Sequence, residues 1–87
     1  MLLPMAWFYI LYSMKLDRYY LGHTSEVVVE RLRKHLSDRK HWTGRAQDWR
    51  IMYTEAFEDK ASAYRREREV KSWKKRSRVE ALIDGSR

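Results

Sequence analysis

The chain has 87 residues, which is enough for one domain over residues 1–87 with a modest core and too few for a second. Hydrophobic residues make up 44% and charged residues 36%, and Cys is absent, so the composition excludes a disordered tail, a disulfide framework and a thiolate metal site, and favours a reducing cytoplasm. Lys and Arg number 19 against 12 acidic residues, and the net charge of +7 indicates a polyanionic partner, nucleic acid before an anionic membrane surface.

Residues 1–14 carry no charge and are rich in apolar and aromatic side chains. A secretory signal is not expected here, because a basic start and a small-residue cleavage site are missing and the stretch is too short to span a bilayer. We expect a buried strand over residues 7–12 and a second strand over residues 19–23. The polar residues between them predict that the two strands form a hairpin.

A helix is expected to follow the hairpin, with Thr24 or Ser25 capping its first turn. Within it, Val28, Leu32 and Leu36 recur at intervals of four and predict one apolar stripe. The polar residues 37–48 then predict a loop that is long for so small a domain.

A third strand is predicted where Trp49, Ile51 and Tyr53 alternate with other residues, a period that places all three on one buried face. Residues 58–75 contain no Gly or Pro and predict a long helix, and the apolar patch at residues 79–83 predicts a short one. The expected fold is therefore α+β. It is a small three-stranded antiparallel or mixed sheet flanked by helices, in the order strand, strand, helix, strand, helix, helix.

Two short motifs lie on the predicted hairpin, Trp7-Phe8-Tyr9 and Tyr20-Leu21-Gly22. Arg31 follows on the first helix and Glu67 on the long helix. In their order and spacing these motifs resemble those of the GIY-YIG nucleases, and the resemblance covers nearly the whole chain. The second motif differs from Tyr-Ile-Gly by one conservative change, whereas the first keeps only the Tyr of Gly-Ile-Tyr.

The resemblance implies an endonuclease that hydrolyses phosphodiester bonds in DNA, in DNA repair or processing, with Mg²⁺ or Mn²⁺ as its cofactor. The catalytic residues that it implies are Tyr9, Tyr20, Arg31, His35 and Glu67. Among these, Glu67 is the expected metal ligand. The residues expected to contact DNA are Gly22, His23, Lys71, Lys74 and Lys75. No membrane partner is expected. We expect either low sequence specificity or recruitment by a protein partner.

The pairing of the hairpin decides whether its tyrosines can act together. If Tyr12 pairs with Tyr19, then Tyr9 faces Gly22 and projects from the same face as Tyr20. Gly22 is then expected to leave room beside Tyr9 for a substrate phosphate. A slip of one residue would separate Tyr9 from Tyr20, and packing of both rings in the core is the alternative role.

Arg31 and His35 are four residues apart and share one helix face, where Arg can fork onto a phosphate and His can accept a proton. A solvated face is the alternative. Glu67 and Glu69 fall on opposite sides of their helix, because a step of two residues turns through about 200°. Only Glu67 lies in the semi-apolar stripe, where a carboxylate needs a metal or a cation such as Arg31, and one carboxylate suits the largely hydrated Mg²⁺.

The mechanism implied by the resemblance assigns the attacking water's proton to Tyr9, aided by His35 or a nearby Lys. Arg31 and Tyr20 hold the phosphate, and a metal on Glu67 stabilises the leaving oxygen. An ordinary Tyr has a pKa of about 10, so this role predicts that neighbouring positive charge lowers the pKa of Tyr9.

A basic tract is expected at the C-terminal end of the long helix, either as a solvated face that complements the helix dipole or as a phosphate track. Its members are Lys71, Lys74, Lys75, Arg76 and Arg78. Trp42 could stack on an unpaired base, and His23 and His41 lack the spacing of metal ligands.

Two departures from the family pattern keep alternatives open. Arg31 lies one residue further from the second motif than expected, and the chain holds no Asn, which many members place after the Glu. One alternative is a catalytically weak or inactive nucleic-acid-binding module of the same fold. The other is a protein-interaction module.

Overall fold

The computed structural model describes residues 3–37 and 46–85. Its elements are β1 (Ala6–Ser13), β2 (Arg18–Thr24), α1 (Val28–Ser37), β3 (Arg50–Phe57), α2 (Lys60–Ser72) and α3 (Arg76–Gly85). The predicted α+β order is confirmed. Most of the expected loop at residues 37–48, with His41 and Trp42, lies outside the described residues.

The sheet has the strand order β2-β1-β3, and both pairings are antiparallel. The uncharged strand β1 lies at the centre, where both of its faces are covered. Of the two hairpin registers that the sequence leaves open, the structure has the one in which Tyr12 pairs with Tyr19 and Tyr9 pairs with Gly22. β2 is left as an edge strand of the described sheet.

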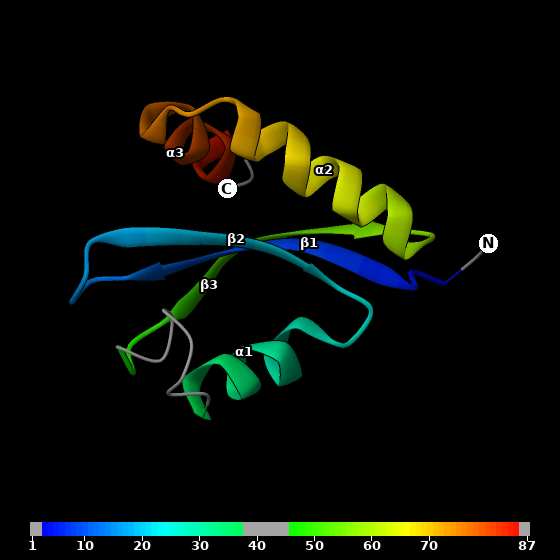
Figure 1. Cartoon of the computed structure of the whole chain (residues 1–87), viewed down its shortest axis with the longest axis horizontal. Helices are drawn as coiled ribbons and strands as arrows, with labels where there is room; N and C mark the ends of the chain where they lie inside the picture. Colours follow the sequence, from blue (N-terminus) through cyan, green and yellow to red (C-terminus); the bar gives the residue numbers. More distant parts are fainter. Residues whose placement is uncertain (1–2, 38–45, 86–87) are drawn as a thin grey trace.

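The helices cover the two faces of the sheet unequally, with α1 on one side and α2 and α3 on the other (Figure 1). Since side chains alternate along a strand, Phe8 and Ile10 face α2 and α3, and Tyr9 and Leu11 face α1. Each face therefore has its own small hydrophobic core. All four of these side chains are at most 1% exposed.

A bulge changes the predicted pattern of β3. Ile10 pairs with Tyr53 and Leu11 pairs with Ile51, so the register shifts by one residue between them. An extra residue in one strand reverses the alternation of side chains beyond it. The prediction that Ile51 and Tyr53 share one buried face is therefore wrong. Ile51 packs in the core beneath α1, and Tyr53 packs in the core beneath α2 and α3.

The first helix begins later than predicted, at Val28. Thr24 is the last residue of β2, and its hydroxyl accepts a hydrogen bond from the backbone N–H of Glu26 at 2.9 Å. A side chain used in this local turn is not capping a helix. Neither Thr24 nor Ser25 is therefore the cap, because the chain must first leave the edge of the sheet and turn beneath it.

The long helix is shorter than the predicted residues 58–75. Asp59 caps its start by accepting a hydrogen bond from the Ser62 N–H at 2.7 Å. Its last residue is Ser72, and the backbone of Lys74 adopts a positive φ of 51° that cannot continue a helix. The predicted basic tract is accordingly divided. Lys71 lies on α2, two lysines lie in the connection, and two arginines lie on α3.

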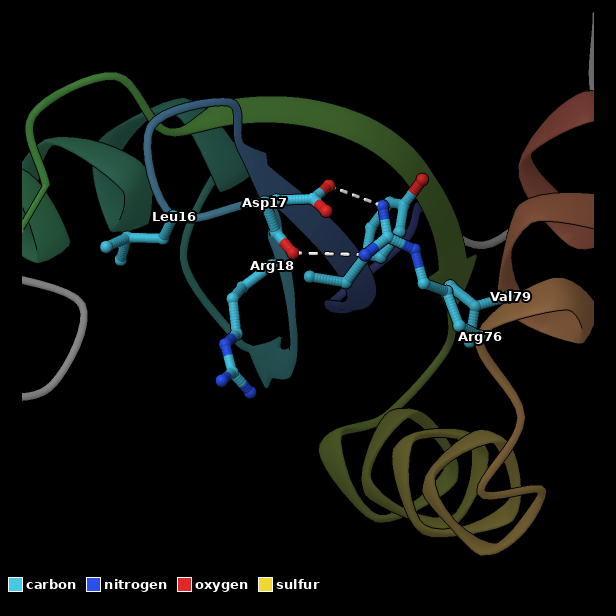
Figure 2. A pocket seen from close by; sticks show the side chains of 6 residues that line it. Leu16, Asp17, Arg18, Arg76 and Val79 are labelled. Atoms are coloured by element: carbon cyan, nitrogen blue, oxygen red, sulfur yellow. Dashed lines mark hydrogen bonds and ion pairs between the residues drawn. The ribbon is translucent and has the colours of Figure 1, made fainter.

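Arg76, at the start of α3, is bound to the hairpin turn (Figure 2). Its guanidinium donates to the Asp17 carboxylate at 2.6 Å and to the Asp17 carbonyl at 3.1 Å, and it lies 5.2 Å from the centre of the Tyr19 ring. This interaction fixes α3 against the end of the hairpin. Arg76 is therefore a structural cation.

None of the helices in residues 3–37 and 46–85 is long and apolar enough to cross a membrane.

Three consecutive valines test how α1 packs. Val28 is 7% exposed, whereas Val29 is 61% exposed. We expect Val28→Ala to lower the free energy of unfolding by about 1 to 3 kcal/mol, because it removes two methyl groups from the core beneath α1. Val29→Ala is the control and should change stability little or raise it slightly, since Ala is the better helix former. Urea denaturation measures both, and equal losses would contradict this packing.

Candidate active site

Tyr9 lies on the central strand, and its phenol crosses the edge strand directly above Gly22. A Cβ atom at residue 22 would lie 2.5 Å from the Tyr9 hydroxyl oxygen and 2.6 Å from Cζ. The expectation that Gly22 leaves room for a substrate phosphate is therefore corrected. The missing side chain leaves room for Tyr9 itself, which carries the hydroxyl outward from β1 over β2.

The Tyr9 hydroxyl meets His35 of α1, with 2.9 Å between the oxygen and Nε2. His35 is buried, and its ring packs edge-on against Tyr20 with 4.7 Å between ring centres. The rings of Tyr9 and Tyr20 lie 6.4 Å apart. The structure thus brings together three of the sequence-predicted catalytic residues. Burial alone would suit core aromatics, but a buried imidazole bonded to a phenol is also a proton-transfer pair.

Arg31 completes this cluster from the preceding turn of α1. Its interaction with the Tyr9 hydroxyl raises the pKa of Arg31. Its Nε is buried and has no hydrogen-bond partner within the described part of the chain. A buried donor without an acceptor costs about 1 to 3 kcal/mol, so an oxygen that reached this nitrogen would relieve that cost. A phosphate oxygen has the right chemistry.

The electrostatics of Tyr9 differ from the expectation. Burial raises the pKa of Tyr9 to about 12, and the adjacent Arg31 opposes this rise without cancelling it. Tyr20 and Glu67 raise the pKa of Tyr9 further. The predicted lowering is therefore wrong, because the loss of hydration outweighs one neighbouring positive charge. Near neutral pH the phenol keeps its proton.

Glu67 of α2 lies on the other side of the sheet. It is 8% exposed, and both of its oxygens are hydrogen-bonded, Oε1 to His23 Nδ1 at 2.8 Å and Oε2 to Lys71 Nζ at 2.7 Å. The predicted contrast with Glu69 is confirmed, because Glu69 is exposed and pairs with Arg66. Glu67 therefore pairs with His23 and Lys71, and the suggested ion pair with Arg31 does not form.

His23 is a partner of Glu67 that the spacing of residues along the sequence does not indicate. It was expected to contact DNA, but its contact with the Glu67 carboxylate was not predicted. The register of the hairpin indicates this contact. His23 pairs with Phe8 and so faces α2, opposite to its neighbour Gly22. Gly22 and His23, consecutive residues of β2, therefore lie on opposite faces of the sheet.

The two halves of the site meet at this edge strand. Tyr9 approaches Gly22 from the face covered by α1, and Glu67 approaches His23 from the face covered by α2. The Glu67 carboxylate is close enough to raise the pKa of Tyr9. Tyr9 and Glu67 are therefore close to each other across β2, although they pack on opposite faces of the sheet.

The chemistry of the donors fits one metal ion of the Mg²⁺ type. No group of three His, Cys, Asp or Glu residues is placed to hold a metal among residues 3–37 and 46–85. Mg²⁺ commonly keeps several waters and uses one or two carboxylates. Glu67 supplies one buried carboxylate, and the Lys71 ammonium already shows that its Oε2 receives a cation. Glu67 is thus the residue that would hold the metal.

A basic groove of about 350 Å³ runs along the outside of β2 next to α2. It brings together the three lysines expected to contact DNA. The described residues that line it include four cations and no carboxylate. They are Tyr19, Tyr20, Leu21, Val70, Lys71, Lys74, Lys75, Arg76 and Val79. Lys71 connects this groove to Glu67, so a phosphate chain in the groove would lead to the site.

A model of the GIY-YIG catalytic domain family matches residues 5–80, which is most of the chain. The protein therefore belongs to the GIY-YIG nuclease family. Members of this family bind DNA and generally depend on a divalent metal. No curated protein and no solved structure gives a significant match to the chain.

The close approach of the Tyr9 ring to Gly22 can be tested by comparison with Gly85 of α3. Gly22→Ala should lower the free energy of unfolding by about 1 to 3 kcal/mol, because the new methyl group displaces the Tyr9 ring. At Gly85 a Cβ would meet nothing within 4 Å, so Gly85→Ala should be neutral. Thermal and urea denaturation compare the two variants. Equal stability would show that the Tyr9 ring does not cross at residue 22.

The protonation of Tyr9 can be followed by NMR of tyrosines labelled with ¹³C at Cζ, with Tyr9→Phe assigning the signal. The expected midpoint is about 12, and Arg31→Gln should raise it further because the guanidinium lowers it. The folded-state pKa exceeds the unfolded value of about 10, so the free energy of unfolding should fall as the pH rises from about 10 to 12. A midpoint below 10 would contradict the burial argument.

Proposed function

We propose that this protein is a metal-dependent endonuclease that hydrolyses phosphodiester bonds in DNA. The observation that carries the proposal is the contact of 2.9 Å between the Tyr9 hydroxyl and His35 Nε2, beside the unpartnered Nε of Arg31. In this cluster, Tyr9 and His35 can transfer a proton, and Arg31 can bind a phosphate. Hydrolysis of a phosphodiester needs both.

Arg31 and Tyr20 hold the scissile phosphate in the proposed reaction. Arg31 donates to a phosphate oxygen through Nε, which has no partner in the part of the chain that the structure describes, and its charge offsets the negative charge that builds up on the phosphoryl oxygens. Tyr20 is fixed against the His35 ring and contributes its hydroxyl. Both residues already contact the Tyr9–His35 pair before substrate arrives.

Tyr9 and His35 move the proton together. As the water oxygen forms its bond to phosphorus, the Tyr9 oxygen takes a proton from that water, and the Tyr9 proton passes to His35 Nε2. The bond from phosphorus to the leaving oxygen breaks, and the leaving oxygen takes a proton from solvent. A relay avoids a free phenolate, which a pKa of about 12 for Tyr9 makes scarce near neutral pH.

Glu67 would hold the Mg²⁺ or Mn²⁺ ion, which when bound supplies positive charge at the leaving oxygen. His23 donates to one oxygen of Glu67 and thereby fixes the orientation of the carboxylate. Lys71 pairs with the other oxygen, and its half-exposed side chain also lines the basic groove. There its charge would meet a DNA phosphate.

The proposed substrate is DNA, because the groove beside Glu67 is basic and the whole chain carries a net charge of +7. A role in DNA repair or processing and a cytoplasmic location remain part of the proposal. The short basic groove reads phosphates and offers few groups to read base edges, so recruitment by a protein partner would supply the specificity.

Two glutamates of one helix provide the test. We expect Glu67→Gln to lower Mg²⁺-dependent cleavage of plasmid and single-stranded DNA by about 100-fold or more, since it removes the charge that holds the metal. Tyr9→Phe should have an effect of similar size. Glu69→Gln is the matched control, because Glu69 is exposed and on the opposite side of α2, and it should leave cleavage nearly unchanged.

Other results would favour other functions. Salt-dependent DNA binding without cleavage would identify an inactive nucleic-acid-binding module, in which Lys71 permanently occupies the position of the metal. Equal activity of the Glu67 and Glu69 variants would refute the assigned site. Absence of DNA binding at low salt would favour a protein-interaction module.

A further inference from the structure

An exposed aromatic side chain lies next to the Glu67 half of the site. Tyr64 is on α2, three residues before Glu67, and residues at this spacing are neighbours on a helix face. It is 43% exposed and is the most exposed aromatic residue in the described part of the chain. Its ring packs against His23, with 5.1 Å between ring centres. The same His23 donates to Glu67.

A shallow cavity of about 380 Å³ opens at this place. The described residues that line it are His23, Lys60, Ala61 and Tyr64, so an imidazole, a phenol and a methyl group form most of its surface. No carboxylate is among them. The cavity therefore presents flat aromatic surface to solvent with a cation at its rim, and this combination suits an aromatic group attached to an anion.

Arg68 holds the Tyr64 ring in place. Its Nη1 donates to the Tyr64 hydroxyl at 3.1 Å, and its Cζ lies 5.9 Å from the centre of the ring. The ring is thus oriented before any ligand binds, which lowers the entropic cost of stacking on it. Lys60 supplies the positive charge among the described residues that line the cavity.

We propose that Tyr64 and His23 form a stacking site for one unpaired nucleobase of the DNA strand that is cut. This inference rests on the proposed nuclease function. The stacking site adjoins Glu67, because His23 contacts both Tyr64 and the Glu67 carboxylate. A stacked base would therefore belong to a nucleotide adjoining the scissile phosphate. Aromatic platforms beside basic grooves bind single strands in this way, whatever the base.

The inference specifies the class of substrate. Inside a duplex both faces of a base are covered by its neighbours, so a base can enter this cavity only from a single-stranded, mismatched, bulged or branched region. Fully paired DNA would contact the lysines of the groove and leave the stacking site empty. The chain is expected to prefer DNA in which the nucleotide at the cut is unpaired.

Binding of an oligonucleotide that contains the fluorescent base 2-aminopurine tests the proposal. The measurement is made in EDTA, so that cleavage plays no part, with single-stranded DNA and with the fully paired duplex. Tyr64→Ala removes the ring, Tyr64→Phe keeps it, and Met14→Ala is the control, because Met14 is an exposed apolar residue of the hairpin turn. Circular dichroism confirms that each variant is folded.

We expect the wild type, Tyr64→Phe and Met14→Ala to quench the fluorescence of one position in the single strand. Tyr64→Ala should lose this quenching and bind the single strand about 10-fold more weakly, with duplex binding unchanged. Unchanged single-strand binding, or an equal loss on both DNAs, would overturn the stacking site. Cleavage that is lost in Glu67→Gln but indifferent to Tyr64→Ala would reject this site while leaving the nuclease intact.

Discussion

The passage of the Tyr9 phenol over Gly22 is the contact on which the rest of the site depends. Any side chain at residue 22 would occupy the space of the phenol. The hairpin register is therefore coupled to the chemistry, because a shift of one residue would place a different side chain beneath the ring. Because the phenol crosses the edge strand, the side chains of His35 and Arg31 can contact it from α1.

Because a sheet is a single layer, both of its faces can contribute side chains to the edge strand β2. The α1 face supplies the phenol, the imidazole and the guanidinium, and the α2 face supplies the carboxylate. β2 separates them with two consecutive residues, Gly22 and His23, which point in opposite directions. The glycine makes room for Tyr9, and the histidine orients Glu67. A domain of 87 residues thus has two small cores and still presents charged groups at its surface.

The charges of the site are balanced in the absence of substrate. Lys71 and His23 satisfy Glu67, and His35 and Arg31 contact Tyr9, while one nitrogen of Arg31 lacks an acceptor among residues 3–37 and 46–85. Such a site is stable without a ligand and yet favours an incoming anion. The positive connection between α2 and α3 extends the same preference along β2, whereas Arg76 is already bound to Asp17.

Local patterns in the sequence determined the order of the elements and the burial of Glu67 but not Glu69. Each of these depends on periodicity within one segment, which is written in neighbouring residues. The bulge opposite Ile10, the late start of α1, the partners of Glu67 and the raised pKa of Tyr9 were decided by the tertiary structure. They depend on which segments pack together and how much water they exclude, and no single segment contains that information.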